Sequence, residues 1–222
     1  MEDVGSDGGK SAPVRRRAVR REAVENRARL LQAAREVFAQ RGPDARVEEI
    51  AQAAGVGMGT FYRNFTTRQA LVDELVADVR HRLLELARRA RGAQDGTGLE
   101  RLLRDAGRAQ ARDPGYMQFL WSRSTVEQAA VDEFLVLLAD LLADAQEAGR
   151  IRPDLAATDV WMTLWSLRGI LEMTRTAAPR AWQRHVDLMI AGLRARPDGD
   201  VGLTTRPMTV TQARRCIQEA SH

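Results

Sequence analysis

Four polar side chains lie within five residues of one another and a fifth follows shortly after: Thr60, Tyr62, Arg63, Asn64 and Arg68. Hydroxyl, guanidinium and amide groups donate hydrogen bonds to the phosphate oxygens and base edges of DNA. Arg63 has the geometry to pair with guanine through two hydrogen bonds, worth ~1–3 kcal/mol of discrimination between bases. A solvated or phosphate-bound side chain is the open alternative for Arg63. Side chains of these types are suited to contact with nucleic acid.

The stretch VEEIAQAAGVGMGTFYRNF, residues 47–65, predicts the scaffold that presents these side chains. Gly55 favours a reversal of the chain, because glycine adopts the left-handed conformation without a Cβ clash. A short helix follows, with Phe61 and Phe65 four apart and facing inward. Two short helices joined by such a turn predict a helix-turn-helix, whose second helix enters a DNA major groove. The first helix places its apolar residues on one face: Val47, Ile50, Ala51 and Ala54.

Helices on both sides are expected to complete this unit. Apolar residues at helical spacing predict a helix that begins at about Glu22 or Ala28 and ends at Arg41, where Gly42 and Pro43 stop it. Its Phe38 is expected to meet Ile50 and Phe61 in a small three-helix core. After the helix-turn-helix, Thr67 is expected to cap a long connecting helix that spans roughly 35 Å at 1.5 Å per residue.

Arginines precede the predicted helix-turn-helix. Residues 1–21 are predicted to form a disordered basic arm, because the first twelve have almost nothing to bury. Within it, Arg17 and Arg20 are expected to lie along phosphates or to reach into the minor groove. A solvated run of charges is the open alternative. Arg46, at the N-terminal edge of the second helix and near the candidate cap Asp44, is also placed for a phosphate.

The run GVGMGTFYRNFTTRQAL, residues 55–71, resembles the recognition helix and the start of the next helix in TetR-type transcriptional repressors. The usual pattern of that family is G-V-S-x-G-T-[LF]-Y-x-[HY]-F-x-[ST]-K-x-x-L, and the resemblance covers about residues 28–76. Two departures stand out: Gly57 replaces the usual serine cap, and Arg68 replaces the usual lysine while keeping its charge. The resemblance implies that Tyr62 and Arg68 contact phosphates and that Thr60 lies at the mouth of the groove. It further implies that base edges are read from three exposed positions: Met58, Arg63 and Asn64.

The second part of the chain is helical by pattern, without strand alternation or internal repeats. Helices are predicted around residues 99–109, 116–123 and 126–148, from Asp154 or Thr158 to about Thr176, from Pro179 to Arg196, and from Thr209 to Ala220. In the family that the chain resembles, the last two long helices pair with their two-fold mates. This implies a homodimer through residues 156–176 and 179–196.

The same resemblance implies an apolar effector cavity in the helical body. The candidate lining residues are rich in methionine and aromatic side chains: Met117, Trp121, Phe134, Trp161, Met162 and Trp165, with Arg168 as a polar group. Ordinary core packing is the alternative for each apolar residue. Arg168 and Glu172 are four apart, so an ion pair between them is the alternative for Arg168.

Composition and motifs argue against several other classes of protein. The net charge is +4, 29% of the residues are charged and 44% are hydrophobic, as in a globular protein. A single cysteine, Cys216, excludes an internal disulfide framework and a cysteine-based zinc site. No secretory signal or membrane span is expected. The three histidines lack a metal or triad context, and no phosphate-binding loop or nucleophile motif appears, so an enzyme and a cofactor are not predicted.

The sequence therefore predicts an all-α protein. The expected parts are a basic arm at 1–21, a DNA-binding head at 22–66, a ligand-binding and dimerisation body at 67–196, and a linker with a possible terminal helix at 197–222. The predicted function is that of a cytoplasmic, ligand-responsive repressor, which binds a near-palindromic DNA operator as a dimer and is released by a small, mostly apolar effector. A ligand-independent architectural DNA-binding protein and a transcriptional activator remain as alternatives.

Overall fold

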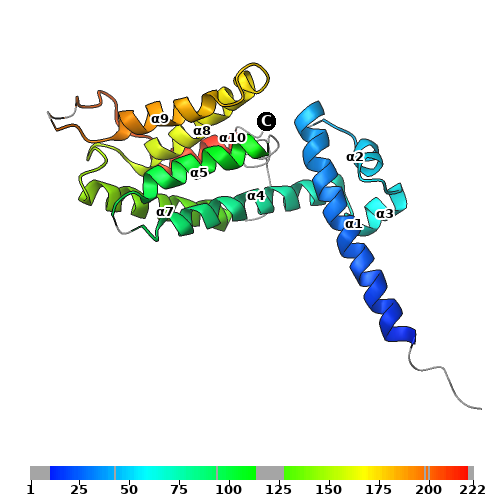
Figure 1. The fold of residues 1–222 in the computed structure, drawn as a ribbon. Coiled ribbons are helices and arrows are strands. Elements are labelled where there is room, and N and C mark those ends of the chain that lie inside the picture. Colours follow the sequence, from blue (N-terminus) through cyan, green and yellow to red (C-terminus); the bar gives the residue numbers. More distant parts are fainter. Residues whose placement is uncertain are drawn as a thin grey trace, which may run out of the picture. The chain divides into compact units, whose positions relative to one another are not determined.

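In the computed structural model, the described residues are 11–42, 44–93, 95–113, 128–197, 199 and 201–219. Within these ranges every regular element is an α-helix, apart from one isolated antiparallel bridge between Ile151 and Arg194. The helices are α1 (Ser11–Arg41), α2 (Val47–Ala53), α3 (Met58–Asn64), α4 (Arg68–Ala90), α5 (Gly98–Arg112), α7 (Gln128–Glu147), α8 (Ala157–Thr174), α9 (Ala181–Leu193) and α10 (Val210–Glu219) (Figure 1). The prediction of an all-α fold is confirmed.

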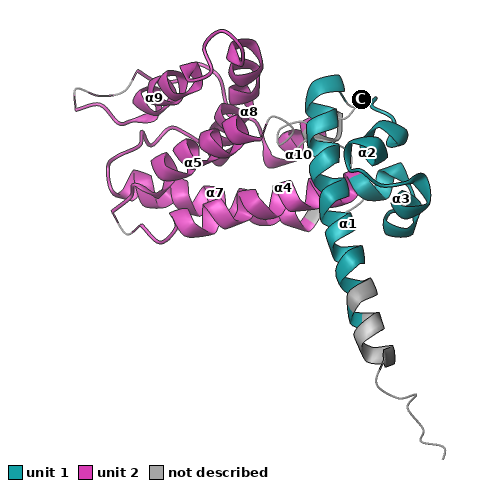
Figure 2. Cartoon of the chain, turned by 45° about the vertical axis from the view of Figure 1, so that its right-hand side comes forward, with its two compact units in different colours: residues 1–71 teal, residues 72–222 magenta. Residues whose placement is uncertain are grey.

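The chain divides into two compact units, residues 1–71 and 72–222, and the division falls inside α4 (Figure 2). In the first unit, which we call the head, α1 packs against both α2 and α3. Phe38, Ile50 and Phe61 are each at most 1% exposed, as are Leu30 and Phe65. The helix-turn-helix is thus held by an apolar core to which α1 contributes one wall.

The beginning of α1 differs from the prediction. The helix starts at Ser11, so residues 11–21, which we expected to be part of a disordered arm, are helical. The physical reason is local: five of these eleven residues are arginine and two are alanine, both of which favour helix, and the segment lacks glycine. Pro13 lies in the first turn, where a missing N–H breaks no helical hydrogen bond.

The second unit, which we call the body, is built from α5, α7, α8 and α9 together with most of α4. Helix α5 contacts α7, α8 and α9, and α8 contacts both α7 and α9. Helix α9 begins two residues after the expected Pro179, and the helix predicted around residues 116–123 lies outside the described residues. The interior is formed by side chains that are at most 2% exposed, among them Leu99, Leu102, Leu103, Leu138, Leu141, Val160, Trp161 and Leu167.

The C-terminal helix α10 is attached to the body by polar contacts. Arg214 of α10 forms an ion pair of 2.7 Å with Asp132 of α7. In the segment before it, the hydroxyl of the buried Thr158 donates to the carbonyl oxygen of Met208 over 2.8 Å. The side chain of Ala213 is fully buried. The chain beyond α9 therefore folds back onto α7 and α8.

A bidentate ion pair joins the beginning of α5 to the end of α9. Arg194 donates to both carboxylate oxygens of Glu100, over 2.8 and 2.6 Å. These hydrogen bonds hold the pKa of the Glu100 carboxyl below its ordinary value of 4.5. Beside this pair, the backbone N–H of Arg152 donates to Leu193 over 3.1 Å, so the end of α9 is also bound to the turn that follows α7.

The substitution Glu100→Gln is expected to destabilise the body at neutral pH. The loss should be about 1–2 kcal/mol, because the Arg194 side chain is 52% exposed and water screens the pair. Since the folded state lowers the pKa of Glu100, its contribution is complete at neutral pH and disappears as the pH falls through that lowered value. Urea denaturation at several pH values, with the exposed Glu147→Gln as control, measures this. A difference that persists unchanged in acid would contradict the assignment.

Candidate nucleic-acid interface

The turn between α2 and α3 depends on a left-handed glycine. Gly55 has φ +66°, and no atom lies within 4 Å of the position that a Cβ would occupy. The backbone N–H groups of Gly55 and Val56 donate to Gln52 and Ala51, each over 3.0 Å, and thereby close the end of α2. The chain then enters α3 at Gly57, the N-cap residue, which offers no side-chain hydrogen bond.

The beginning of α2 is capped by a carboxylate. Arg46 is the N-cap residue, and its backbone N–H donates to Glu49 over 2.9 Å. Asp44, which we expected near the cap, lies two residues earlier and is exposed. Glu49 also accepts a hydrogen bond from Arg41 of α1. The Arg46 side chain remains exposed beside the start of α2.

Arg27 holds the C-terminal end of α3 in the head, and Arg68 holds the start of α4. The guanidinium of Arg27 donates to the carbonyl oxygen of Asn64 over 2.5 Å and lies 4.2 Å from the centroid of the Phe65 ring. Arg68 donates to the carbonyl oxygen of Ala45 over 3.4 Å, and its guanidinium lies 5.3 Å from the centroid of the Phe38 ring. Arg27 was not among the predicted residues, because its role depends on a contact with a residue 37 positions away.

The outer face of α3 carries the polar residues from which the prediction began. Tyr62 is 51% exposed, and the edge of its ring packs against Phe61 with centroids 5.4 Å apart. Arg63 donates to the hydroxyl of Thr60 over 2.9 Å and to the carbonyl oxygen of Gly59 over 3.2 Å. The amide of Asn64 donates to the carbonyl oxygen of Thr60 over 2.8 Å. In the free protein, the side chains of Thr60, Arg63 and Asn64 thus form hydrogen bonds within α3.

The remaining head candidates are distributed over two helices. Met58 is half-buried in the first turn of α3, and Arg17 and Arg20 are exposed on the N-terminal part of α1. A run of exposed cations on a helix offers the positive charge that a phosphate backbone attracts. Whether these particular residues contact DNA stays a prediction.

The candidates for an effector cavity fall into three groups. Phe134 and Trp161 are buried in the body, and the Trp161 and Trp165 rings lie with centroids 4.8 Å apart. Met162 is 42% exposed, and the Arg168 side chain is 47% exposed with its guanidinium 4.0 Å from Glu172. Met117 and Trp121 lie outside the described residues. Met162 and Arg168 therefore lie at the surface, and Arg168 forms the pair that its spacing allows.

Two other kinds of site are absent from the described residues. Among them, no group of three or more His, Cys, Asp or Glu side chains is arranged to hold a metal ion. No described helix is long and apolar enough to cross a membrane.

Comparison with known proteins identifies the family. Residues 30–75 match the family model described as "Bacterial regulatory proteins, tetR family", and residues 94–195 match "Transcriptional regulator SbtR-like, C-terminal domain". A TetR transcription regulatory protein from Mycobacterium vanbaalenii is 34% identical, with a TM-score of 0.55; the match covers 80% of this chain and 99% of that one. The chain belongs to the TetR family of transcriptional regulators. Helices α2 and α3 are the helix-turn-helix of this family.

Two further relatives support the assignment to the TetR family. A TetR transcriptional regulator from Streptomyces coelicolor is 31% identical over 76% of this chain and 98% of its own, with a TM-score of 0.53. The uncharacterized HTH-type regulator YdgC of Bacillus subtilis is 42% identical over 64 residues, which are 28% of this chain and 33% of that relative. The match thus spans about a third of the curated relative.

Serine at positions 55 and 57 should have opposite effects on the head. Gly55→Ser should cost about 1–2 kcal/mol, because a side chain at this positive φ is strained even where space is open. Gly57→Ser should stabilise the head by a few tenths of a kcal/mol, because the hydroxyl supplies the missing N-cap. Amide hydrogen exchange in α2 and α3 measures both changes. Equal effects at the two positions would contradict this account of the turn.

Proposed function

We propose that this TetR-family protein is a ligand-responsive repressor that binds a near-palindromic operator as a homodimer. The observation that carries the proposal is the outer face of α3, where Thr60, Tyr62, Arg63 and Asn64 lie on a helix whose inner face is buried. A helix whose inner face is packed against the rest of the head enters the major groove in one orientation. Each side chain of its outer face then meets a defined position of the operator.

The residues of the head divide between two kinds of contact. Phosphates are assigned to Tyr62, Arg46 and Arg68, and to Arg17 and Arg20 of α1. Base edges are assigned to the exposed positions of α3: Met58, Arg63 and Asn64, with Thr60 at the mouth of the groove. Arg63 would exchange its bonds to Thr60 and Gly59 for bonds to DNA. Because it already has partners in the free protein, part of the free energy gained from DNA is offset.

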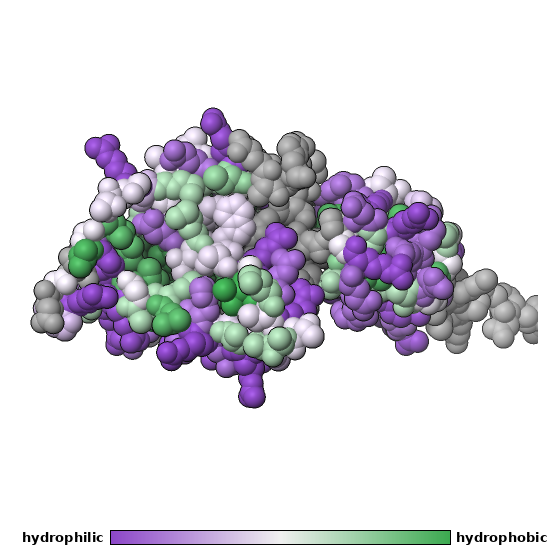
Figure 3. Space-filling view, turned by 90° about the horizontal axis from the view of Figure 1, so that it is seen from above, coloured by the Kyte–Doolittle hydropathy of each residue, from purple (hydrophilic) through white to green (hydrophobic). Residues whose placement is uncertain are grey.

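A homodimer through α8 and α9 is supported by their exposed apolar side chains. Met162 and Met173 of α8 are 42% and 83% exposed, and Leu188 of α9 is 58% exposed. Figure 3 shows hydrophobic residues on the face of the body that is seen from above, the side on which α8 and α9 lie in Figure 1. Burying these residues against a second copy removes apolar surface from water. Two heads are then available for two half-sites, ~34–36 Å apart on DNA.

The effector is proposed to be a small, mostly apolar molecule held in the body. Its support is the aromatic and apolar interior near Trp161, Trp165 and Phe134. Arg168 gives no support for an anionic effector, since its partner is Glu172 at the surface. Release from DNA requires that the effector bind more tightly to the dimer whose heads are spaced wrongly for the operator.

The operator that the protein selects from a random DNA library should be nearly palindromic. Tyr62→Ala should weaken binding at least tenfold for all sequences alike, because a phosphate contact carries no base information. Arg63→Gln should instead relax the preference at one base pair of each half-site. Quantitative mobility-shift assays measure both, with Gln40→Ala on α1 as control. Unchanged affinity for Tyr62→Ala would refute the assignment of the head contacts. In a separate assay, a panel of metabolites is added to the protein–DNA complex, and effector control is refuted if none of them releases the DNA.

The dimer should depend on Leu188 and not on an equally exposed residue elsewhere in the body. Leu188→Glu places two carboxylates in the proposed interface, so the dissociation constant of the dimer should rise at least tenfold. Val136→Glu on α7 is the matched control, because Val136 is 61% exposed and lies outside this interface. Sedimentation equilibrium distinguishes the two. Equal dimerisation of both variants would place the interface elsewhere.

A further inference from the structure

A groove on the surface of the body lies between α5 and α9. It encloses about 220 Å³ and is lined by Arg104, Arg108, Trp182, Gln183, Val186 and Asp187. Drug-sized ligands occupy sites of ~300–1,000 Å³, so this groove suits a smaller molecule. Its residues belong to two helices that contact each other directly, and none of them is among the candidates for the effector cavity.

Trp182 forms the apolar wall of this groove. Its six-membered ring lies against the backbone of α5 at Gly107, where a Cβ would come within 2.7 Å of the ring. Trp182 is only 7% exposed, but its indole N–H is not among the buried polar atoms that lack a partner, and it donates to no acceptor in the described part of the chain. The packing of the ring against α5 thus fixes the position of Trp182 in the wall of the groove.

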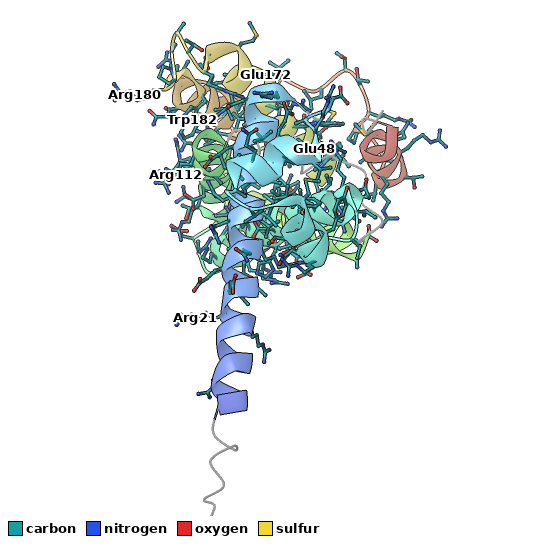
Figure 4. All side chains as sticks on the ribbon, turned by 90° about the vertical axis from the view of Figure 1, so that its right-hand side faces the viewer. Arg21, Glu48, Arg112, Glu172, Arg180 and Trp182 are labelled. Atoms are coloured by element: carbon teal, nitrogen blue, oxygen red, sulfur yellow. The ribbon has the colours of Figure 1, made fainter. Side chains whose placement is uncertain are left out.

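The charged residues that line the groove are Arg104, Arg108 and Asp187. Arg104 is paired with Asp187 across the two helices, and Arg108 with Asp105 over 2.5 Å. Four arginines lie on one face of α5 by their spacing, Arg101, Arg104, Arg108 and Arg112, and neither Arg101 nor Arg112 has an ion-pair partner among the described residues. Figure 4 shows Arg112 of α5, Arg180 just before α9 and Trp182 of α9 on the same side of the body. The cations on this surface exceed Asp105 and Asp187 in number.

From this arrangement we infer a binding site for a small anion, a carboxylate or phosphate, in the groove between α5 and α9. The guanidinium groups of Arg104 and Arg108 supply charge and paired donors, which suit the planar or tetrahedral oxygens of such anions. Trp182 and the Gln183 amide supply further donors. Arg108 is 57% exposed and its pair with Asp105 is screened by water, so it exchanges partners at little cost. Asp187 competes with the anion for Arg104.

The indole N–H signals of the full-length ¹⁵N-labelled protein test this site. Inorganic phosphate and succinate are titrated separately at constant ionic strength, with chloride as the replaced anion, and the Trp182 signal is assigned with Trp182→Phe. At least one of the two anions should shift this signal saturably, with half-saturation at or below the millimolar range, while the other indole signals stay in place. The two arms distinguish a phosphate from a carboxylate ligand.

Charge variants at the surface decide whether the groove is responsible. Arg104→Gln combined with Arg108→Gln should weaken binding at least tenfold, and Asp187→Asn should tighten it several-fold by releasing Arg104. Arg89→Gln, an exposed arginine of α4, should leave it unchanged. Thermal unfolding confirms that each variant is folded. The inference is overturned if neither anion gives a saturable shift, if the double variant binds as well as the original protein, if Asp187→Asn binds more weakly, or if all indole signals move together.

Discussion

The position of α3 depends on the burial of Phe61 and Phe65 against α1. Both side chains are at most 1% exposed, and burying a phenylalanine contributes about 1.5–3 kcal/mol. This burial fixes which face of the short helix is turned outward, and Arg27 adds a hydrogen bond and a cation–π contact at its C-terminal end. A seven-residue helix is too short to be stable by itself in water. The whole outer face of α3 therefore exists only because the inner face is packed.

Arginine has several different physical tasks in this molecule. Arg27 and Arg68 lie over aromatic rings and bind carbonyl oxygens, so both contribute to the structure of the head. Arg194 binds Glu100 through two hydrogen bonds and connects the ends of α5 and α9. The planar guanidinium permits these stacked and bidentate contacts, which an ammonium group cannot reproduce. Net charge alone does not reveal which of these tasks a given arginine performs.

The body is organised around α5, which touches α7, α8 and α9. Gly107 illustrates the difference between local preference and packing. Considered locally, a glycine weakens a helix by roughly 1 kcal/mol relative to alanine. In the folded body its missing Cβ allows Trp182 to approach the α5 backbone, since a Cβ there would come within 2.7 Å of the ring. Gly107 thus lowers the local stability of α5 but allows α5 and α9 to pack closely.

The sequence by itself determined the helical fold, the family and the helix-turn-helix. The reason is that Gly55, the pair Phe61 and Phe65, and the apolar periodicity of the long helices are local signals, each visible within a few residues. The start of α1 at Ser11, within the segment predicted to be disordered, departs from the prediction. Only the tertiary structure decided the role of Arg27 and brought together the residues of the groove between α5 and α9. Trp182 and Gly107 are 75 positions apart, and Arg104 and Asp187 are 83 apart, so no spacing in the chain predicts that they meet. Side chains acquire such roles from packing between distant helices, which the order of the residues does not encode locally.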